Sequence, residues 1–219
     1  MNKNQILDTI KEVRKGSKKR NFSQSLDVVF NLKDLDLKKP DHKVKTFVTL
    51  PKGRGKAMKV CALVGGSLHN DAKENCNMVI IDSDFGNYDK KAVKKVIEQN
   101  DFFIAQADIM PKVAKAFGRF LGVAGKMPNP KAGQIVPPKG STKPIVEKMQ
   151  KTVVLVTKGE LAVKCSFGME DMKDEELVEN FMTVHKELIN VLPLHEQNVK
   201  SIVLKMTMGK PVLVGGEKK

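Results

Sequence analysis

Two segments near the start of the chain alternate between apolar and polar side chains. Residues 25–32 and 44–50 both repeat with a period of two, and in the first of them Leu26, Val28 and Phe30 share one side. This pattern is typical of a strand with one buried and one exposed face. Residues 4–15 and 174–191 instead space their apolar side chains three and four apart. That spacing predicts amphipathic helices, which can cover the apolar face of such a sheet.

A different pattern occupies the middle of the chain. Residues 60–64, 78–81 and 102–105 are continuous apolar runs, which suit strands buried on both faces, as in parallel sheets. Helical stretches separate them, and we expect these at residues 67–75 and 89–99 and from Asp108 onward, with Pro111 in the first turn. A long loop and a short helix after Thr142 follow. Strands that alternate with helices indicate βαβ units.

The alternating pattern returns in the last third of the chain. Residues 152–157 and 161–167 predict a hairpin, and residues 199–206 predict a further strand. Two kinds of sheet in one chain indicate two domains. The half-exposed strands flank the buried ones, as they would if the parallel block interrupted the other domain, although periodicity alone does not prove this.

An inserted domain would be joined to the rest of the chain by two segments. The sequence places these junctions at residues 53–55 and near Lys151. We therefore take Gly53, Gly55 and Lys151 as hinge positions between a discontinuous domain, residues 1–54 plus 152–219, and an inserted domain, residues 55–151.

Charge narrows the choice of partner. The chain has 219 residues and a formal net charge of +14, with 39 basic and 25 acidic side chains. The excess is uneven: residues 1–54 carry 14 basic and 6 acidic side chains, whereas residues 152–219 carry 9 and 10. Such an excess favours a polyanion, either nucleic acid or an anionic membrane face. A basic surface that serves only solubility remains the alternative.

Several function classes have little support. No apolar run reaches eighteen residues, so we expect no membrane span and no membrane partner. The first five residues lack the apolar stretch of a secretory signal, and the three cysteines form no CxxC pair, which favours a cytoplasmic location. The four histidines are scattered and metal-ligand spacings are missing, so we expect no catalytic residues, no metal and no cofactor. The turn Gly65-Gly66-Ser67 after a buried strand keeps a nucleotide site open as an alternative.

Two segments have the chemistry of an RNA contact. Arg20, Asn21, Phe22, Ser23 and Ser25 combine a cation, an aromatic ring and short hydrogen-bonding groups just before a strand. Thr207, Met208 and Gly209 end another strand with a hydroxyl, a soft apolar side chain and a residue without a side chain. In both cases the alternative is that the apolar side chain, Phe22 or Met208, packs into the core. The low aromatic content of 5% argues against a stacking platform for single strands.

Five stretches make the chain resemble a known family. They are residues 20–27 (RNFSQSLD), 44–56 (VKTFVTLPKGRGK), 101–110 (DFFIAQADIM), 121–130 (LGVAGKMPNP) and 207–209 (TMG). They occur in the order found in the family of the universal large-subunit ribosomal protein L-one, the protein of the lateral stalk beside the tRNA exit site. The sequence around DFFIAQADIM is more similar to archaeal than to bacterial members of the family.

The resemblance implies a fold and a function. The fold is a split two-layer α/β sandwich formed by both chain ends, with an inserted Rossmann-like three-layer α/β domain. The function is that of a structural constituent of the large ribosomal subunit in the cytoplasm. The protein would be a monomer within the ribosome, bind stalk rRNA and assist release of deacylated exit-site tRNA. By the same resemblance it represses translation of its own mRNA, through a mimic of the rRNA site.

The resemblance also assigns RNA-binding residues. Phe22 and its neighbours fall on one side of the RNA surface, and the segment 207–209 falls on the other. Lys164, Ser166 and Gly168 from the second predicted hairpin strand are further candidates. The chain departs from the usual family pattern at two places: it has Gly122-Val123-Ala124-Gly125 where the family has Gly-Pro-Arg-Gly, and Lys210 intervenes between Gly209 and Pro211.

Overall fold

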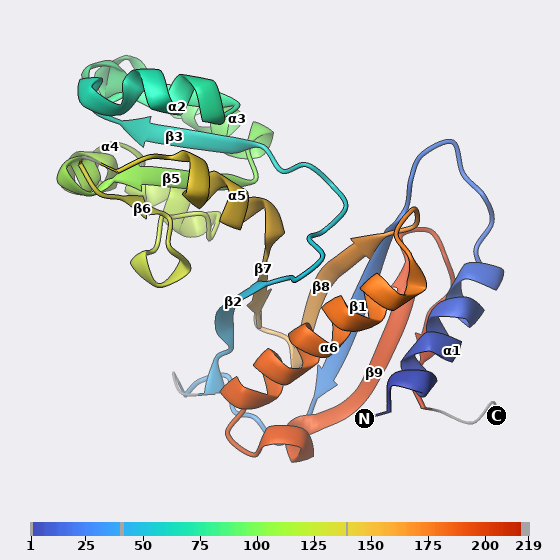
Figure 1. Ribbon diagram of the computed structural model, residues 1–219. Coiled ribbons are helices and arrows are strands. Elements are labelled where there is room, and N and C mark those ends of the chain that lie inside the picture. The colour runs from blue at the N-terminus through green and yellow to red at the C-terminus, as the bar shows by residue number, and fades with distance from the viewer. Residues whose placement is uncertain (1, 40–41, 139, 216–219) are drawn as a thin grey trace. The chain divides into compact units, whose positions relative to one another are not determined.

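Strands with alternating burial and strands buried on both faces belong to two different units of the chain (Figure 1). The computed structural model describes residues 2–39, 42–138 and 140–215. One unit comprises Met1–Lys56 with Lys151–Lys219, and the other comprises Ala57–Gln150. Each unit has its own hydrophobic core and is described by itself.

A four-stranded antiparallel sheet forms the centre of the first unit. Its strands are β1 (Ser25–Leu32), β8 (Ala162–Met169), β9 (Val199–Met206) and β10 (Val212–Leu213), in the order β10-β9-β1-β8. Burial alternates along β1 as the sequence predicted, with Leu26, Val28, Phe30 and Leu32 buried and the intervening side chains partly exposed. The sheet therefore has one apolar face and one polar face.

Two helices cover the apolar face (Figure 1). Helix α1 (Lys3–Lys15) contributes Ile6, Ile10 and Val13, and α6 (Asp174–Val191) contributes the apolar side chains that the helical spacing predicted. The ring of Phe30 on β1 lies 6.1 Å from that of Phe181 on α6. Both helices lie on one face, so the unit has two layers, and within the described ranges no helix of this unit covers the polar face of the sheet.

The predicted hairpin of residues 152–167 is wrong. Strand β7 (Thr152–Val156) pairs with β2 (Lys45–Thr49) in a separate two-stranded antiparallel sheet, and β8 pairs with β1. The single bridge between Thr157 and Val163 is what remains of a local pairing. The sequence pattern favours neighbouring strands as partners, whereas β8 gains a seven-residue ladder by pairing with the more distant β1.

The second unit is a parallel sheet between two helix layers. Its strands β3 (Val60–Val64), β4 (Met78–Ile81), β5 (Phe102–Gln106) and β6 (Ile135–Val136) lie in the order β4-β3-β5-β6. Helices α3 (Lys90–Gln99) and α4 (Met110–Val123) share a core with Cys61, Leu63 and Phe103 on one face. Helices α2 (His69–Asn75) and α5 (Lys143–Lys151) supply buried side chains on the other, which explains why β3 and β5 are buried throughout.

The LGVAGKMPNP stretch has a structural explanation in this unit. The ammonium of Lys126 donates to the carbonyls of Ile97 at 2.7 Å and Asn100 at 2.6 Å, at the end of α3. These carbonyls lack partners within the helix, so Lys126 caps it. The Asn129 side chain accepts from the N–H of Lys131 at 2.9 Å and orders the following turn.

Two amide side chains, the buried one of Asn180 and the half-buried one of Gln150, hold the segments next to the unit boundary. Asn180 on α6 accepts from the N–H of Lys52 at 3.1 Å and donates to the carbonyl of Gly53 at 2.8 Å. In the second unit, Gln150 bonds the N–H and the carbonyl of Met58, each at 2.7 Å. Between these residues, Gly53 and Gly55 have positive φ angles of 70° and 73°, a conformation that glycine adopts without strain. None of the helices within the described ranges is long and apolar enough to cross a bilayer.

Candidate nucleic-acid interface

The two segments singled out in the sequence lie side by side in the first unit. The backbone N–H of Ser25 donates to the hydroxyl of Thr207 at 3.0 Å, and the backbone N–H of Thr207 donates to the carbonyl of Ser25 at 3.1 Å. The ladder pairing of Leu26 with Met206 aligns the start of β1 with the end of β9. Residues 182 positions apart in sequence therefore form one edge of the sheet.

Both apolar side chains at this edge are exposed. Phe22 exposes 52% of its surface and Met208 exposes 61%, so the alternative that they pack into the core is wrong. Other large apolar side chains of this unit are exposed as well, but Phe22 and Met208 are the two that lie in adjoining loops, and such a grouping is typical of a binding site. Arg20 and Asn21 are exposed in the same loop.

A polar row runs from this edge along the uncovered face of the sheet. In the ladders, Asp27 on β1 pairs with Ser166 on β8 and with Lys205 on β9, and Val29 pairs with Lys164. Asp27, Lys164, Ser166 and Lys205 contribute to the lining of a shallow pocket on this face. The hydroxyl of Ser25 donates to the carboxylate of Asp27 at 3.0 Å, which connects the edge to the row. Two of the three further candidates, Lys164 and Ser166, thus lie on the same face as the edge residues.

The third candidate, Gly168, faces the core. It is buried, and it pairs with Leu26 through the bulge that shifts the register between Leu26 and Asp27. A Cβ at this position would overlap the Cδ2 of Leu177 on α6. A glycine is thus required here because the helix packs directly against the strand. The side-chain position of residue 168 is not on the polar face with Lys164 and Ser166.

Gly209 closes the turn at the other segment. Its N–H donates to the carbonyl of Met206 at 3.0 Å, and a Cβ here would lie 3.2 Å from the Cβ of Met206 and 3.5 Å from the hydroxyl of Ser17. The turn therefore packs closely against the loop that follows α1. Lys210 continues it as an exposed cation.

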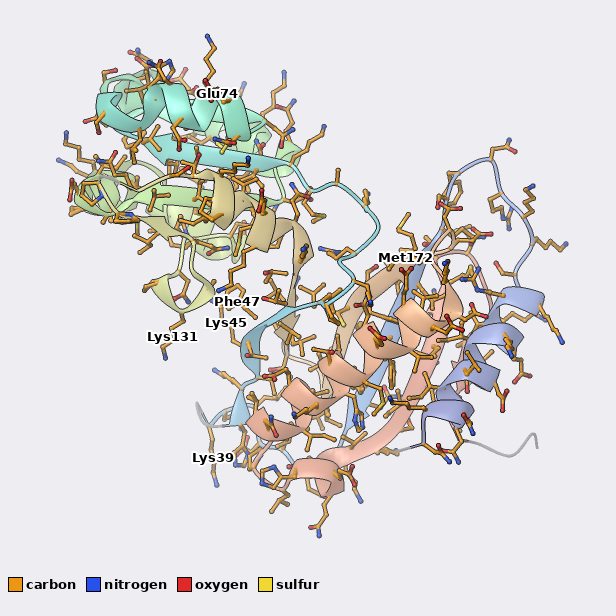
Figure 2. The ribbon with its side chains drawn as sticks, in the orientation of Figure 1. Lys39, Lys45, Phe47, Glu74, Lys131 and Met172 are labelled. Atoms are coloured by element: carbon orange, nitrogen blue, oxygen red, sulfur yellow. The ribbon has the colours of Figure 1, made fainter. Side chains whose placement is uncertain are left out.

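The sequence did not single out three residues that support this surface, namely Arg14, Asp171 and Gln24. The guanidinium of Arg14 donates to the carbonyls of Glu170 at 2.7 Å and Met172 at 2.6 Å, and its Nε lies 2.8 Å from the carboxylate of Asp174. Figure 2 shows Met172 just before α6. The loop so held places Asp171 to accept from the hydroxyl of Ser23 at 2.5 Å. Gln24, between two predicted site residues, is fully buried.

These supporting residues give a weak sequence signal. Arg14 is one of four basic residues in the sequence of α1, and Gln24 occupies one polar position in a polar loop, so neither departs from its surroundings. The one local signal for Gln24 is its position between Phe22 and Leu26, the first inward side chain of β1. Its burial depends on the contact with the turn at 207–209, which no local pattern reveals.

The structure of the second unit argues against a nucleotide site at the turn Gly65-Gly66-Ser67. The N–H of Gly65 donates to the side-chain oxygen of Gln106 at 2.8 Å, between the carboxyl ends of β3 and β5. An open parallel sheet binds a nucleotide at this end of its strands. Here the buried Gln106 side chain already accepts from the backbone N–H of Gly65, which a phosphate would need as a donor.

Metal-ligating groups do not gather in the described ranges, where no three His, Cys, Asp or Glu side chains come together in a ligand arrangement. Asp82, at the end of β4, has its carboxylate 2.7 Å from the ammonium of Lys112. The hydrogen bond from Lys112 is the main cause that lowers the pKa of this carboxyl.

Comparison with known proteins agrees with these features. A family model described as the ribosomal protein L1p/L10e family matches residues 13–210, which span both units. The chain belongs to this family. The resemblance noted from five sequence stretches is thereby confirmed. The family consists of ribosomal proteins rather than enzymes, and this ribosomal protein is not an enzyme.

Individual relatives extend over the whole of this ribosomal protein. The large ribosomal subunit protein uL1 of Nanoarchaeum equitans is 42% identical over 212 residues, covering 95% of this chain and 98% of the relative. The protein of the same name from Methanothermococcus thermolithotrophicus is 40% identical over 98% of this chain and 99% of its own. That from Methanocaldococcus jannaschii is 36% identical, over 100% and 98%. The archaeal character of the sequence is confirmed.

The departure in the loop after α4 is visible in this ribosomal protein. Val123, at the end of α4, exposes 90% of its surface, and Gly125 has a φ angle of 69°. Ala124 stands where the usual family pattern has an arginine, so this loop lacks that cation. The basic groups of the second unit closest in sequence are Arg119 on α4 and Lys126, and the latter is used as a helix cap.

Proposed function

We propose that this ribosomal protein, which is a structural constituent of the large ribosomal subunit in the cytoplasm, binds the stalk segment of its rRNA. The binding surface, here called the stalk-RNA surface, comprises residues 20–23, Ser25, residues 207–209, Lys164 and Ser166. The observation that carries the proposal is the hydrogen-bonded junction of Ser25 and Thr207, which joins two exposed loops into one site.

The side chains at this junction match a folded RNA. Hydroxyl and amide groups of Ser25, Asn21 and Thr207 can bond 2′-hydroxyls and phosphates, and Phe22 and Met208 can pack on riboses or bases. Lys18, Lys19 and Arg20 lie in the first loop, Lys210 follows the second, and all four are exposed. Cations around a polar and apolar centre are expected for recognition of RNA shape with phosphate contacts at the rim.

The acidic groups at the surface add selectivity. Asp27 and Asp171 bond Ser25 and Ser23 in the free protein, and a carboxylate disfavours indiscriminate approach of phosphates. The same carboxylates accept hydrogen bonds from base amino groups or 2′-hydroxyls. An RNA with a matching donor arrangement is therefore preferred over RNA in general.

We further propose that the two units move relative to one another about Gly53, Gly55 and Lys151. Such a movement would assist release of deacylated tRNA from the exit site. We propose that each ribosome contains one copy of the protein. Ribosomes carrying Gly53→Pro, which cannot take the positive φ, are expected to release exit-site tRNA more slowly than ribosomes with the unaltered chain. Equal rates in a stopped-flow release assay contradict this part of the proposal.

Repression of the protein's own mRNA uses the same surface. A leader that mimics the rRNA site would compete with stalk RNA for Phe22 and Met208. Titration of the protein on a mixture of its leader and stalk RNA tests this, and simultaneous binding of both contradicts it.

The proposal as a whole is tested with purified protein and two RNAs of equal length, a stalk segment and an unrelated duplex. The stalk segment is expected to bind at least a hundredfold more tightly at moderate salt. A variant in which a flexible linker joins residue 56 directly to residue 151 keeps every residue of the stalk-RNA surface. We expect it to retain the preference, and its loss in a folded variant would move the site to the second unit.

A further inference from the structure

The only fully buried polar side chain in the loop between α1 and β1 is that of Gln24, as far as the described residues show. It exposes 0% of its surface, whereas its neighbours Phe22 and Ser23 are exposed. A buried amide needs partners for both its N–H groups and its oxygen, because an unbonded one destabilises the fold. Its partners therefore indicate what the side chain does.

Those partners lie in the loop between α1 and β1 and in the turn at 207–209. The amide nitrogen donates to the hydroxyl of Ser17 at 3.2 Å and to the carbonyl of Lys18 at 3.2 Å. The amide oxygen accepts from the backbone N–H of Met208 at 3.2 Å. A single planar group thus joins the loop that carries Phe22 to the turn that carries Met208.

The backbone of Gln24 adds a third attachment. Its N–H donates to the carboxylate of Glu170 at 3.2 Å, and its carbonyl accepts from the N–H of Glu170 at 2.8 Å. The carbonyl of Glu170 is in turn held by Arg14 at 2.7 Å. The backbone of Gln24 is therefore bonded to a loop that Arg14 fixes to α1, and its side chain is bonded to the turn at 207–209.

We propose that Gln24 is a positioning residue for RNA recognition: it fixes the spacing between Phe22 and Met208 without touching the RNA. This inference rests on the proposed function of the stalk-RNA surface. Recognition of RNA shape needs its contact groups held in place before binding, since ordering them on binding weakens affinity. Among uncharged side chains of this length, only glutamine offers two donors and an acceptor on one group.

The test compares Gln24→Met with Gln106→Met. Both variants replace a buried glutamine amide by an apolar side chain of similar length, but Gln106 lies in the second unit and bonds Gly65. We expect Gln24→Met to weaken stalk-RNA binding at least tenfold and to leave binding of an unrelated duplex unchanged. The salt dependence is expected to stay the same, because the phosphate-binding cations are intact. Gln106→Met is expected to bind both RNAs normally.

A second variant keeps the test informative if the first folds poorly. Gln24→Asn keeps an uncharged amide with two donors and an acceptor, but its side chain is one methylene shorter, so its bond to the Met208 N–H is weakened and its loss of affinity should be smaller. Hydrogen exchange of the Met208 amide gives a readout without RNA. It is expected to be faster in both variants, while amides of β1 and β9 keep their rates.

Two results overturn the inference. One is a folded Gln24→Met that binds stalk RNA as the unaltered protein does, and the other is an equal loss of affinity for both RNAs. Failure of the proposed function looks different, because the unaltered protein would then bind the stalk segment no better than the unrelated duplex.

Discussion

The hydroxyl oxygens of Ser25 and Thr207 lie 3.0 Å apart, although 182 residues separate them in the chain. The N–H of Ser25 also donates to the Thr207 hydroxyl at 3.0 Å. These contacts turn the ends of β1 and β9 into one site in the unit built from both chain ends. The proposed RNA contact therefore depends on the tertiary structure rather than on a continuous motif.

Thr207→Ala removes the hydroxyl at this junction. A neutral hydrogen bond contributes about 1 kcal/mol, so we expect stalk-RNA affinity to fall roughly fivefold while the urea midpoint changes little. Thr183→Ala is the matched control, since Thr183 on α6 bonds the carbonyl of Glu179 within its own helix. Fluorescence titration with stalk RNA measures the effect, and equal affinity of the two variants contradicts a role for Thr207.

Met208→Asp places a carboxylate where we expect an RNA ribose or base. Because Met208 is 61% exposed, the folded protein should keep its thermal midpoint, while stalk-RNA affinity falls at least tenfold through charge repulsion and lost packing. Val123→Asp makes the same change at a side chain that is 90% exposed in the second unit. If the two variants lose affinity equally, net charge rather than position is responsible.

Gly168→Ala tests the packing role of that glycine. The added Cβ would overlap Leu177, so the variant is expected to lose about 1–3 kcal/mol of unfolding free energy. Gly66→Ala serves as the control, because nothing lies within 4 Å of a Cβ there and its φ is not positive. Urea denaturation measures both, and an unchanged midpoint for Gly168→Ala contradicts the close packing of α6 on β8.

The sequence predicted most elements from periodicity alone. Alternation predicted β1, and uninterrupted apolar runs predicted β3 and β5, because burial on one face or on two faces determines the order of apolar and polar residues along a strand. Pairing left no such trace: β7 and β8 follow one another yet join different sheets. The roles of Gly168 and Gln24 were also invisible, since each depends on a contact with a distant segment, Leu177 for one and Met208 for the other.

His185 on α6 gives the first unit a dependence on pH. Its ring is stacked 6.0 Å from that of Phe181 and lies 6.2 Å from that of Phe30. Burial is the main cause that lowers the pKa of this imidazole, and the nearby Glu196 opposes it only in part. The folded state thus prefers the neutral form, whereas the unfolded chain takes up a proton near pH 6.5.

Since the unfolded state binds more protons below that pH, stability is expected to fall as the pH decreases through about 6.5. Urea midpoints at pH 7.5 and pH 5.5 measure the change, and His185→Gln should flatten it. A midpoint that rises on acidification over this interval contradicts the assignment.

Recognition of stalk rRNA is proposed to depend on its backbone phosphates and on the junction of Ser25 with Thr207. The most direct measurement is the affinity for a stalk segment across a series of salt concentrations, with an unrelated duplex of equal length as competitor. If about six phosphates are contacted, log K is expected to fall with log salt at a slope of roughly −4 to −5, with the stalk segment preferred throughout. A slope near zero, or equal affinity for the two RNAs, would contradict the account.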